Sequence, residues 1–161
     1  MNSLAKTPLE ILDNKYKLKT LSDKEDINGS RHLVKVFPNN LKAIEIFSVN
    51  NLVHRENLPA VIEYFFSYEA DKEIVCFTKY FNQGECFLIK EFYHTGNLKS
   101  VLKCNNFYIH DADGPAIINY NRDGTITNQL YYYKNNLVGE NLQISGKDCV
   151  FEYFSNSQIL S

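Results

Sequence analysis

Two histidines of this sequence are candidates for chemistry because each begins one copy of a repeated motif. The segment HRENLPAVIEY at 54–64 returns as HDADGPAIINY at 110–120. Brought together, His54 and His110 could act as paired metal ligands or as a general base. A residue that recurs with a repeat is explained more simply by the repeat itself. We therefore interpret both imidazoles as partners of backbone groups in their turns, and we assign no role to the isolated His32 and His94.

Carboxylates offer two further possibilities. HDADG at 110–114 resembles part of a calcium loop, but calcium needs about six to eight oxygen ligands and the rest of such a loop is missing, so we predict an ordinary Asp-Gly-Pro turn. Glutamates of predicted strands could instead converge as an acid/base pair. Outward positions on a half-solvated sheet are the commoner place for such residues. The glutamates concerned are Glu45, Glu63, Glu91 and Glu152.

Cysteines and sequence motifs give no support for an enzyme. The cysteines are scattered and include no CxxC pair, so we predict reduced packing residues and no zinc site. The chain has no GxSxG, P-loop, GxGxxG or HExxH motif. The sequence therefore predicts no catalytic residue, no metal and no cofactor. The cysteines are Cys76, Cys86, Cys104 and Cys149.

Aromatic side chains are the stronger candidates for function. Tyr131, Tyr132 and Tyr133 are consecutive, so in a strand at least one ring points away from the core. Exposed rings beside asparagines favour contact with another protein, whereas the alternative is that they cover the sheet itself. Rings near lysines could also stack on single-stranded RNA. The predicted protein-binding residues are Tyr131, Tyr132, Tyr133, Tyr80, Phe81 and Tyr93, and the nearby lysines are Lys79, Lys90 and Lys134.

Composition limits the class of protein. The chain has 161 residues, of which 44% are hydrophobic and 22% charged, so we expect one folded domain with a real core. A net charge of −2 argues against a dedicated nucleic-acid binder. No apolar stretch is long enough for a membrane helix and no signal peptide is evident, which predicts a cytoplasmic protein without a membrane partner.

Secondary structure changes along the chain. Thr7-Pro8, with Glu10 three residues after Thr7, predicts a short helix over 7–18. The polar stretch 22–30 ends in Asn-Gly and predicts a connecting loop. From residue 31, alternating apolar residues and Asn- or Gly-containing turns predict antiparallel hairpins. The fold class is therefore mainly β: a meander of β-hairpin repeats with one short N-terminal α-helix.

The repeat divides the chain into three parts within a single domain. Residues 1–30 form the N-terminal helix and linker. Residues 31–144 form two successive β-hairpin units of similar length. Residues 145–161 supply a closing strand that caps the second unit.

These segments resemble a known repeat family. YYYKNNLVGE at 131–140, EFYHTGNLK at 91–99 and INYNRDGTI at 118–126 are similar to the MORN-type hairpin repeat. HRENLPA and HDADGPA are similar to its HRxxGPA variant, found in bacterial and viral proteins. Leu58 departs from this pattern where the second copy has Gly114. The resemblance implies consecutive antiparallel hairpins that serve as a binding or scaffolding surface, without catalytic residues, and some bacterial members are labelled antitoxin-like.

The sequence thus predicts a non-enzymatic protein-binding module. A narrower hypothesis is a small inhibitor, antitoxin-like or from a mobile element, that occludes a nuclease or toxin, with nucleic acid involved only indirectly. The alternatives are a structural protein that self-assembles through sheet edges, an acid/base hydrolase and an RNA-binding protein.

Overall fold

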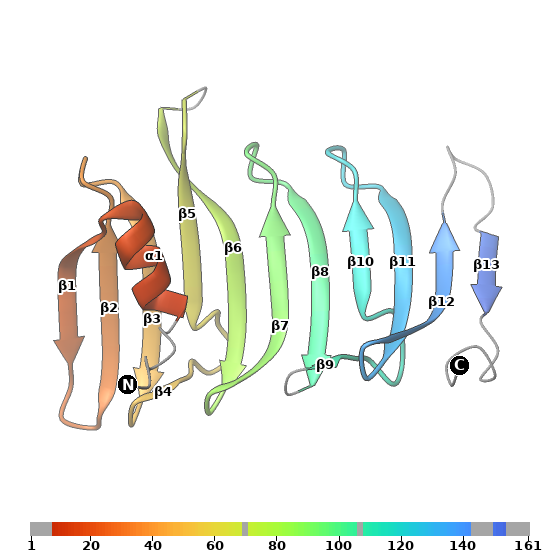
Figure 1. Cartoon of the computed structure of the whole chain (residues 1–161), viewed down its shortest axis with the longest axis horizontal. Helices are drawn as coiled ribbons and strands as arrows, with labels where there is room; N and C mark the ends of the chain where they lie inside the picture. The colour runs from red at the N-terminus through yellow and green to blue at the C-terminus, as the bar shows by residue number, and fades with distance from the viewer. Residues whose placement is uncertain (1–7, 69–70, 106–107, 143–149, 154–161) are drawn as a thin grey trace, which may run out of the picture.

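Consecutive hairpins build this protein as an open antiparallel sheet, seen face-on in Figure 1. The computed structural model describes residues 8–68, 71–105, 108–142 and 150–153. This confirms the predicted hairpin meander with a short helix. The elements are α1 (Pro8–Tyr16), β1 (Lys19–Glu25), β2 (Ser30–Val36), β3 (Lys42–Val49), β4 (Leu52–Val53), β5 (Val61–Ser67), β6 (Lys72–Asn82), β7 (Glu85–Phe92), β8 (Leu98–Asn105), β9 (Tyr108–Ile109), β10 (Ile117–Tyr120), β11 (Ile126–Tyr133), β12 (Asn136–Leu142) and β13 (Val150–Tyr153).

The strands lie in the sheet in the order in which they occur in the chain. The path runs β1-β2-β3-β5-β6-β7-β8-β10-β11-β12-β13, with β4 paired to β3 and β9 to β8. Tight turns make this order possible. At 50–51, 83–84 and 134–135 both central residues have positive φ, the backbone of a type I′ hairpin turn, which Asn and Gly adopt most readily.

Strand pairing repeats together with the sequence. Ile46 pairs with Val61 between β3 and β5, and their counterparts in the second copy, Leu102 and Ile117, pair in the same way between β8 and β10. The β6–β7 hairpin likewise recurs as β11–β12. Residues in matching registers can therefore be compared one to one between the copies.

The predicted connecting loop over 22–30 is wrong. Ser22–Glu25 belong to β1, which pairs with β2, and the turn begins only at Asp26. The carboxylate of Asp26 accepts hydrogen bonds from the backbone N–H groups of Asn28 and Ser30. Because β1 is an edge strand with mostly exposed residues, it lacks the apolar alternation by which the other strands are recognised. The region 1–30 therefore contributes a strand as well as a helix.

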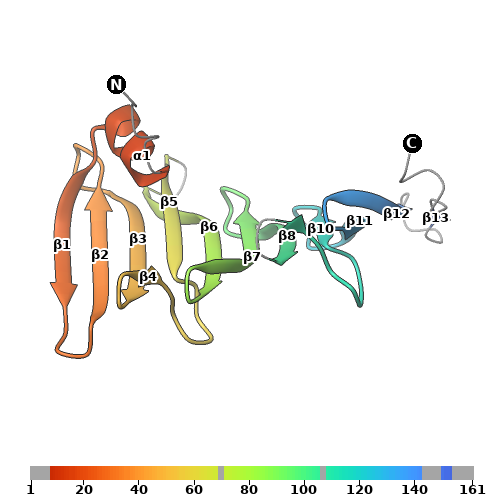
Figure 2. The same cartoon turned by 60° about the horizontal axis from the view of Figure 1, so that its bottom comes forward.

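The helix prediction is confirmed with slightly different ends. α1 covers Pro8–Tyr16 of the predicted 7–18, while its proposed cap Thr7 lies outside the described residues. α1 lies against the N-terminal part of the sheet (Figures 1 and 2). Asp13 forms an ion pair with Lys35 of β2, and the ring of Tyr16 meets that of Phe37 edge-on at 6.0 Å.

The core is smaller than we expected from the composition. Among the described residues, the buried apolar side chains are few and concentrate in β2, β3 and the start of β5. The reason is that most of the sheet forms a single layer, so its apolar residues stay partly exposed on both faces (Figure 2). The buried apolar residues are Val34, Val36, Ala43, Ile44, Ala60, Val61 and Ala116.

One strand is described in the predicted C-terminal closing segment. β13 (Val150–Tyr153) lies within the predicted closing strand and pairs with β12, while the other residues of 145–161 lie outside the described part of the chain. In the described ranges no helix has the length and apolar character required to cross a membrane.

Candidate binding groove

The repeated motif forms two loops, at 54–60 and 110–116, that we call the repeat loops. Each is fastened to the sheet in the same way. The alanine that ends the loop donates its N–H to one neighbouring strand and accepts an N–H from the other, so Ala60 bonds to Lys79 and Phe47. Ala116 makes the same bonds with Leu130 and Lys103. Both alanine side chains are fully buried. The repeat therefore fixes two similar loops at the same end of the sheet.

A groove of about 830 Å³ lies between the repeat loops. His54, Arg55 and Glu56 of the first loop line one side, and His110 and Asp111 of the second loop line the other. Between them the lining comes from β6, β7 and β8, including Phe81, Phe87 and Cys86. A second hollow of about 500 Å³, lined by β2 and β3, shares the first loop with this groove.

Several exposed apolar side chains belong to elements at this end of the sheet, where β4, β9 and the β6–β7 and β11–β12 turns lie (Figure 1). Phe87 on the groove is 47% exposed, and Tyr133 beside the second repeat loop is 54% exposed. Exposed apolar side chains near a groove are candidates for contact with a partner. The other members are Leu52, Leu58 and Tyr108.

The structure brings some of the predicted binding aromatics to this groove and places others elsewhere. Phe81 lines the groove, and the ring of Tyr80 lies 6.2 Å from that of Phe87. Tyr133 packs against His110 at 5.0 Å. Tyr93 belongs to the opposite end, where its hydroxyl donates to the carbonyl of Tyr120.

The three consecutive tyrosines of β11 do not form one exposed surface. Tyr131 and Tyr132 are half-buried and only Tyr133 is exposed. The register shift of the β11–β12 pair falls between Tyr131 and Tyr132, so simple alternation does not describe this strand end.

The two repeated histidines have different surroundings. Nδ1 of His54 accepts a hydrogen bond from the backbone N–H of Gln83, in the β6–β7 turn and not in its own turn. Nδ1 of His110 is buried without a partner among the described residues. The structural interpretation thus holds for His54 with a different turn, whereas for His110 the described contacts give Nδ1 no backbone partner. The loop aspartate Asp111 accepts the N–H of Asp113 and forms an ion pair with Lys103, as an ordinary turn residue does.

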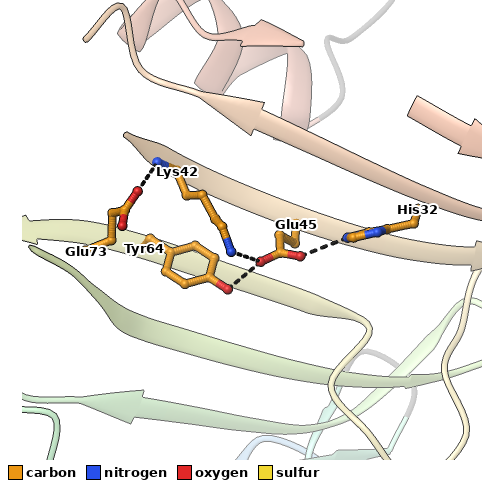
Figure 3. Close-up of polar contacts among 5 residues, drawn as sticks. All are labelled: His32, Lys42, Glu45, Tyr64 and Glu73. Carbon is orange, nitrogen blue, oxygen red and sulfur yellow. Dashed lines mark hydrogen bonds and ion pairs between the residues drawn. The ribbon is translucent and has the colours of Figure 1, made fainter. Parts of the chain in front are cut away.

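Glu45 is buried, which contradicts the predicted outward position. Its carboxylate accepts hydrogen bonds from the hydroxyl of Tyr64 at 2.5 Å, from Lys42 at 3.0 Å and from Nε2 of His32 at 2.8 Å (Figure 3). Burial favours the neutral acid, but these three hydrogen bonds outweigh it and lower the pKa of Glu45 to about 2. Burial and the Glu45 charge together raise the pKa of Tyr64. Glu73 adds to the cluster by accepting the backbone N–H of Lys42 (Figure 3).

Two of the other strand glutamates named from the sequence also form ion pairs. Glu63 forms an ion pair with Lys79, and Glu91 forms one with Lys99, while the side chain of Glu152 lies outside the described residues. A general acid near neutral pH needs a carboxyl with a raised pKa, and Glu45 has a lowered one. The cluster therefore suits a structural role better than acid/base chemistry.

Two cysteines line the groove as half-buried free thiols. The Cys104 thiol donates to the carbonyl of Cys86 at 3.1 Å, and burial raises the pKa of Cys104 to about 12 and also raises that of Cys86. Cys76 is also free, and burial raises its pKa to about 11. Such thiols are poor nucleophiles. Cys149 lies outside the described residues. Within the described ranges no three His, Cys, Asp or Glu side chains are grouped as metal ligands.

Comparison with known proteins assigns neither a family nor a function to this chain. No protein-family model matches the chain, and no curated protein sequence matches it. One solved structure, a GtfA/B complex bound to UDP and GlcNAc, aligns with 95% of this chain at 8% identity and a TM-score of 0.30. The chain covers only 26% of the length of that protein. A likeness at this level carries no argument about fold or function.

Sequence reasoning did not single out Arg55 and Phe87, which line the groove. For Arg55 a signal exists, because the sign of the charge reverses at this position: HRENLPA has arginine where HDADGPA has Asp111. For Phe87 no sequence signal separates it from the many aromatic residues of neighbouring strands.

Proposed function

We propose that this protein is a non-enzymatic protein-binding module that docks a partner protein in the groove between its repeat loops. The observation that carries the proposal is the groove itself, open between two anchored loops, with the half-exposed ring of Phe87 in its lining. Aromatic side chains in concave surfaces contribute large contact area at low entropic cost, which is typical of protein interfaces.

Charge supports a protein partner over nucleic acid. Three carboxylates (Glu56, Glu85 and Asp111) line the groove, against two cations, Arg55 and Lys103. Nucleic-acid sites need several cations to neutralise phosphates, and the overall net charge is −2. RNA binding is therefore the weaker candidate.

The edge strand β1 argues against self-assembly through that edge. β1 (KTLSDKE) carries charges at several exposed positions, and such charges discourage strand-to-strand pairing between copies. The groove, and not this edge, is the surface that we assign to binding.

Photo-crosslinking from inside the groove tests this function. Benzoylphenylalanine replaces Phe87 in the full chain, and the protein is irradiated in lysate of the cells that produce it naturally. The matched control carries the same group at Tyr68, a 91% exposed aromatic directly after β5, which ends at the other end of the sheet. We expect a protein adduct from position 87 that is absent from position 68 and survives nuclease treatment.

Other results would overturn the proposal. Equal adducts from both positions would indicate non-specific contact, and an adduct lost after nuclease treatment would indicate an RNA bridge. An adduct between two copies of this chain would favour self-assembly instead.

A further inference from the structure

The repeat copies differ most clearly at one pair of touching residues. In the second copy, Lys103 and the loop residue Asp111 form an ion pair. The corresponding two positions of the first copy hold Phe47 and Arg55. Here the guanidinium carbon of Arg55 lies 3.8 Å from the centre of the Phe47 ring. An ion pair that satisfies both charges in one copy is thus replaced by a cation held on an aromatic ring.

Arg55 is one layer of a stack. The ring of His32 lies parallel to Phe47, with 4.2 Å between centroids and 8° between planes. Since one face of the ring has no room for both groups at these separations, His32 and Arg55 lie on opposite faces. The hydrogen bond from His32 to the buried Glu45 fixes the far side of this stack (Figure 3). Position 88, the counterpart of His32, is a leucine, so the stack is particular to the first copy.

This arrangement leaves the hydrogen-bond donors of Arg55 available. At 3.8 Å the guanidinium of Arg55 lies flat on the ring, because an N–H aimed at the ring would bring its nitrogen too close; the N–H groups therefore point outward in the plane. Among the described residues no carboxylate forms an ion pair with Arg55, although Arg31 is paired with Asp23 and Lys103 with Asp111. Arg55 lines both the main groove and the adjoining hollow, so its donors are reached from either one.

We propose that Arg55 is an anion-binding residue that receives one carboxylate, from an Asp or Glu side chain of the partner protein. A guanidinium held flat matches a carboxylate through two parallel hydrogen bonds. The surrounding carboxylates Glu56, Glu85 and Asp111 disfavour a polyanion such as nucleic acid, which would need several free cations. Phe87 in the same groove receives an apolar neighbour of the acidic residue. This inference rests on the proposed protein-binding function.

Peptide selection followed by charge variants tests the inference. A phage-displayed library of random peptides is selected on the immobilised full chain, and enriched peptides are synthesised and titrated by calorimetry. We expect an Asp or Glu shared among the enriched peptides, and a loss of affinity of about tenfold or more with Arg55→Gln, as for a charged hydrogen bond. Arg122→Gln is the matched control, because Arg122 also lies over a ring, that of Tyr93, and belongs to the β10–β11 turn at the opposite end of the sheet.

Exchange of residues between the copies supplies a second measurement. Phe47→Lys with Arg55→Asp places the ion pair of the second copy into the first, and should abolish peptide binding while the thermal unfolding curve remains cooperative. Arg55→Glu should restore binding of a peptide whose acidic residue is replaced by lysine. Both results would support a direct pair between Arg55 and the peptide carboxylate.

The outcomes separate this inference from the proposed function. Peptides that lose affinity with Phe87→Ser but not with Arg55→Gln would overturn the role of Arg55 and leave the groove as a binding surface. Peptides affected by neither variant, or no enriched peptides, would count against both. Equal losses with Arg55→Gln and Arg122→Gln would show general electrostatic attraction and also overturn the inference.

Discussion

Glu45 illustrates at the residue scale how context changes the meaning of a side chain. In the sequence it is one of several glutamates in predicted strands, but in the structure it is the buried centre of a partly exposed cluster with His32, Lys42 and Tyr64. Lys42 shares β3 with Glu45, but His32 belongs to β2 and Tyr64 to β5, and these strands become neighbours of β3 only when the sheet forms. The cluster also holds His32 against Phe47, and so supports the ring on which Arg55 lies.

The lowered pKa of Glu45 predicts acid-sensitive stability. Its pKa of about 2 in the folded protein lies below its ordinary value of 4.5, so the ionised carboxylate favours the folded state. This contribution, roughly 3 kcal/mol, is fully present above about pH 4.5 and is lost as the pH falls toward 2. We expect Glu45→Gln to lower the free energy of unfolding at neutral pH, and the difference from the wild type to shrink between pH 5 and about pH 2.

Urea unfolding at a series of pH values measures this difference. Glu25→Gln is the control, since Glu25 is exposed on the edge strand β1. A gap between the wild type and Glu45→Gln that stays constant down to about pH 2 would contradict the assigned pKa.

At the scale of the elements, the repeat loops depend on small side chains where they return to the sheet. Ala60 and Ala116 are fully buried and hydrogen-bonded on both sides through their backbones. The sequence showed that both copies share this alanine, but not why. The structure supplies the reason: each loop enters the sheet at this residue, between two neighbouring strands.

Enlarging these alanines should therefore destabilise the protein. We expect Ala60→Val and Ala116→Val each to lower the free energy of unfolding by about 1–3 kcal/mol, because a well-packed site cannot accept extra methyl groups. Ala112→Val, at an exposed position of the second repeat loop, should change it by less than about 0.5 kcal/mol. Chemical denaturation compares the three variants, and equal effects at all three positions would refute the packing argument.

The whole molecule is a sheet whose core is uneven. Among the described residues, the buried apolar side chains other than Ala116 belong to β2, β3, Ala60 and the start of β5, next to the end that α1 covers. Later strands rely on backbone pairing and half-buried side chains. Regions with few buried apolar contacts open at a lower free energy than the core does.

Hydrogen exchange should reveal this gradient along the sheet. We expect amides of β2, β3 and β5 to exchange most slowly, and those of β10, β11 and β12 to exchange faster. Exchange followed by mass spectrometry of peptide fragments measures both regions in one sample. Uniform protection from β2 to β12 would mean that the sheet opens only as one unit.

Much of the fold could be predicted from the sequence, because hairpins are local. Alternating apolar residues and Asn- or Gly-containing turns set the strands and their order, since each strand pairs with a neighbour close in the chain. The edge strand β1 was not predicted, because its exposure on both faces removes the apolar alternation by which a strand is recognised.

The candidate site was decided by tertiary structure. Phe81 and Tyr133 could be named from the sequence, but Tyr93 lies at the other end of the sheet, and strand direction decides which end a residue reaches. The groove forms only because two loops far apart in the chain come to lie on either side of the same strands. The sequence by itself determined the repeat, and that its two copies have Arg55 and Asp111 at matching positions. Only the packed sheet decided that Arg55 lies on Phe47 with its donors directed outward, because that contact joins residues from separate elements.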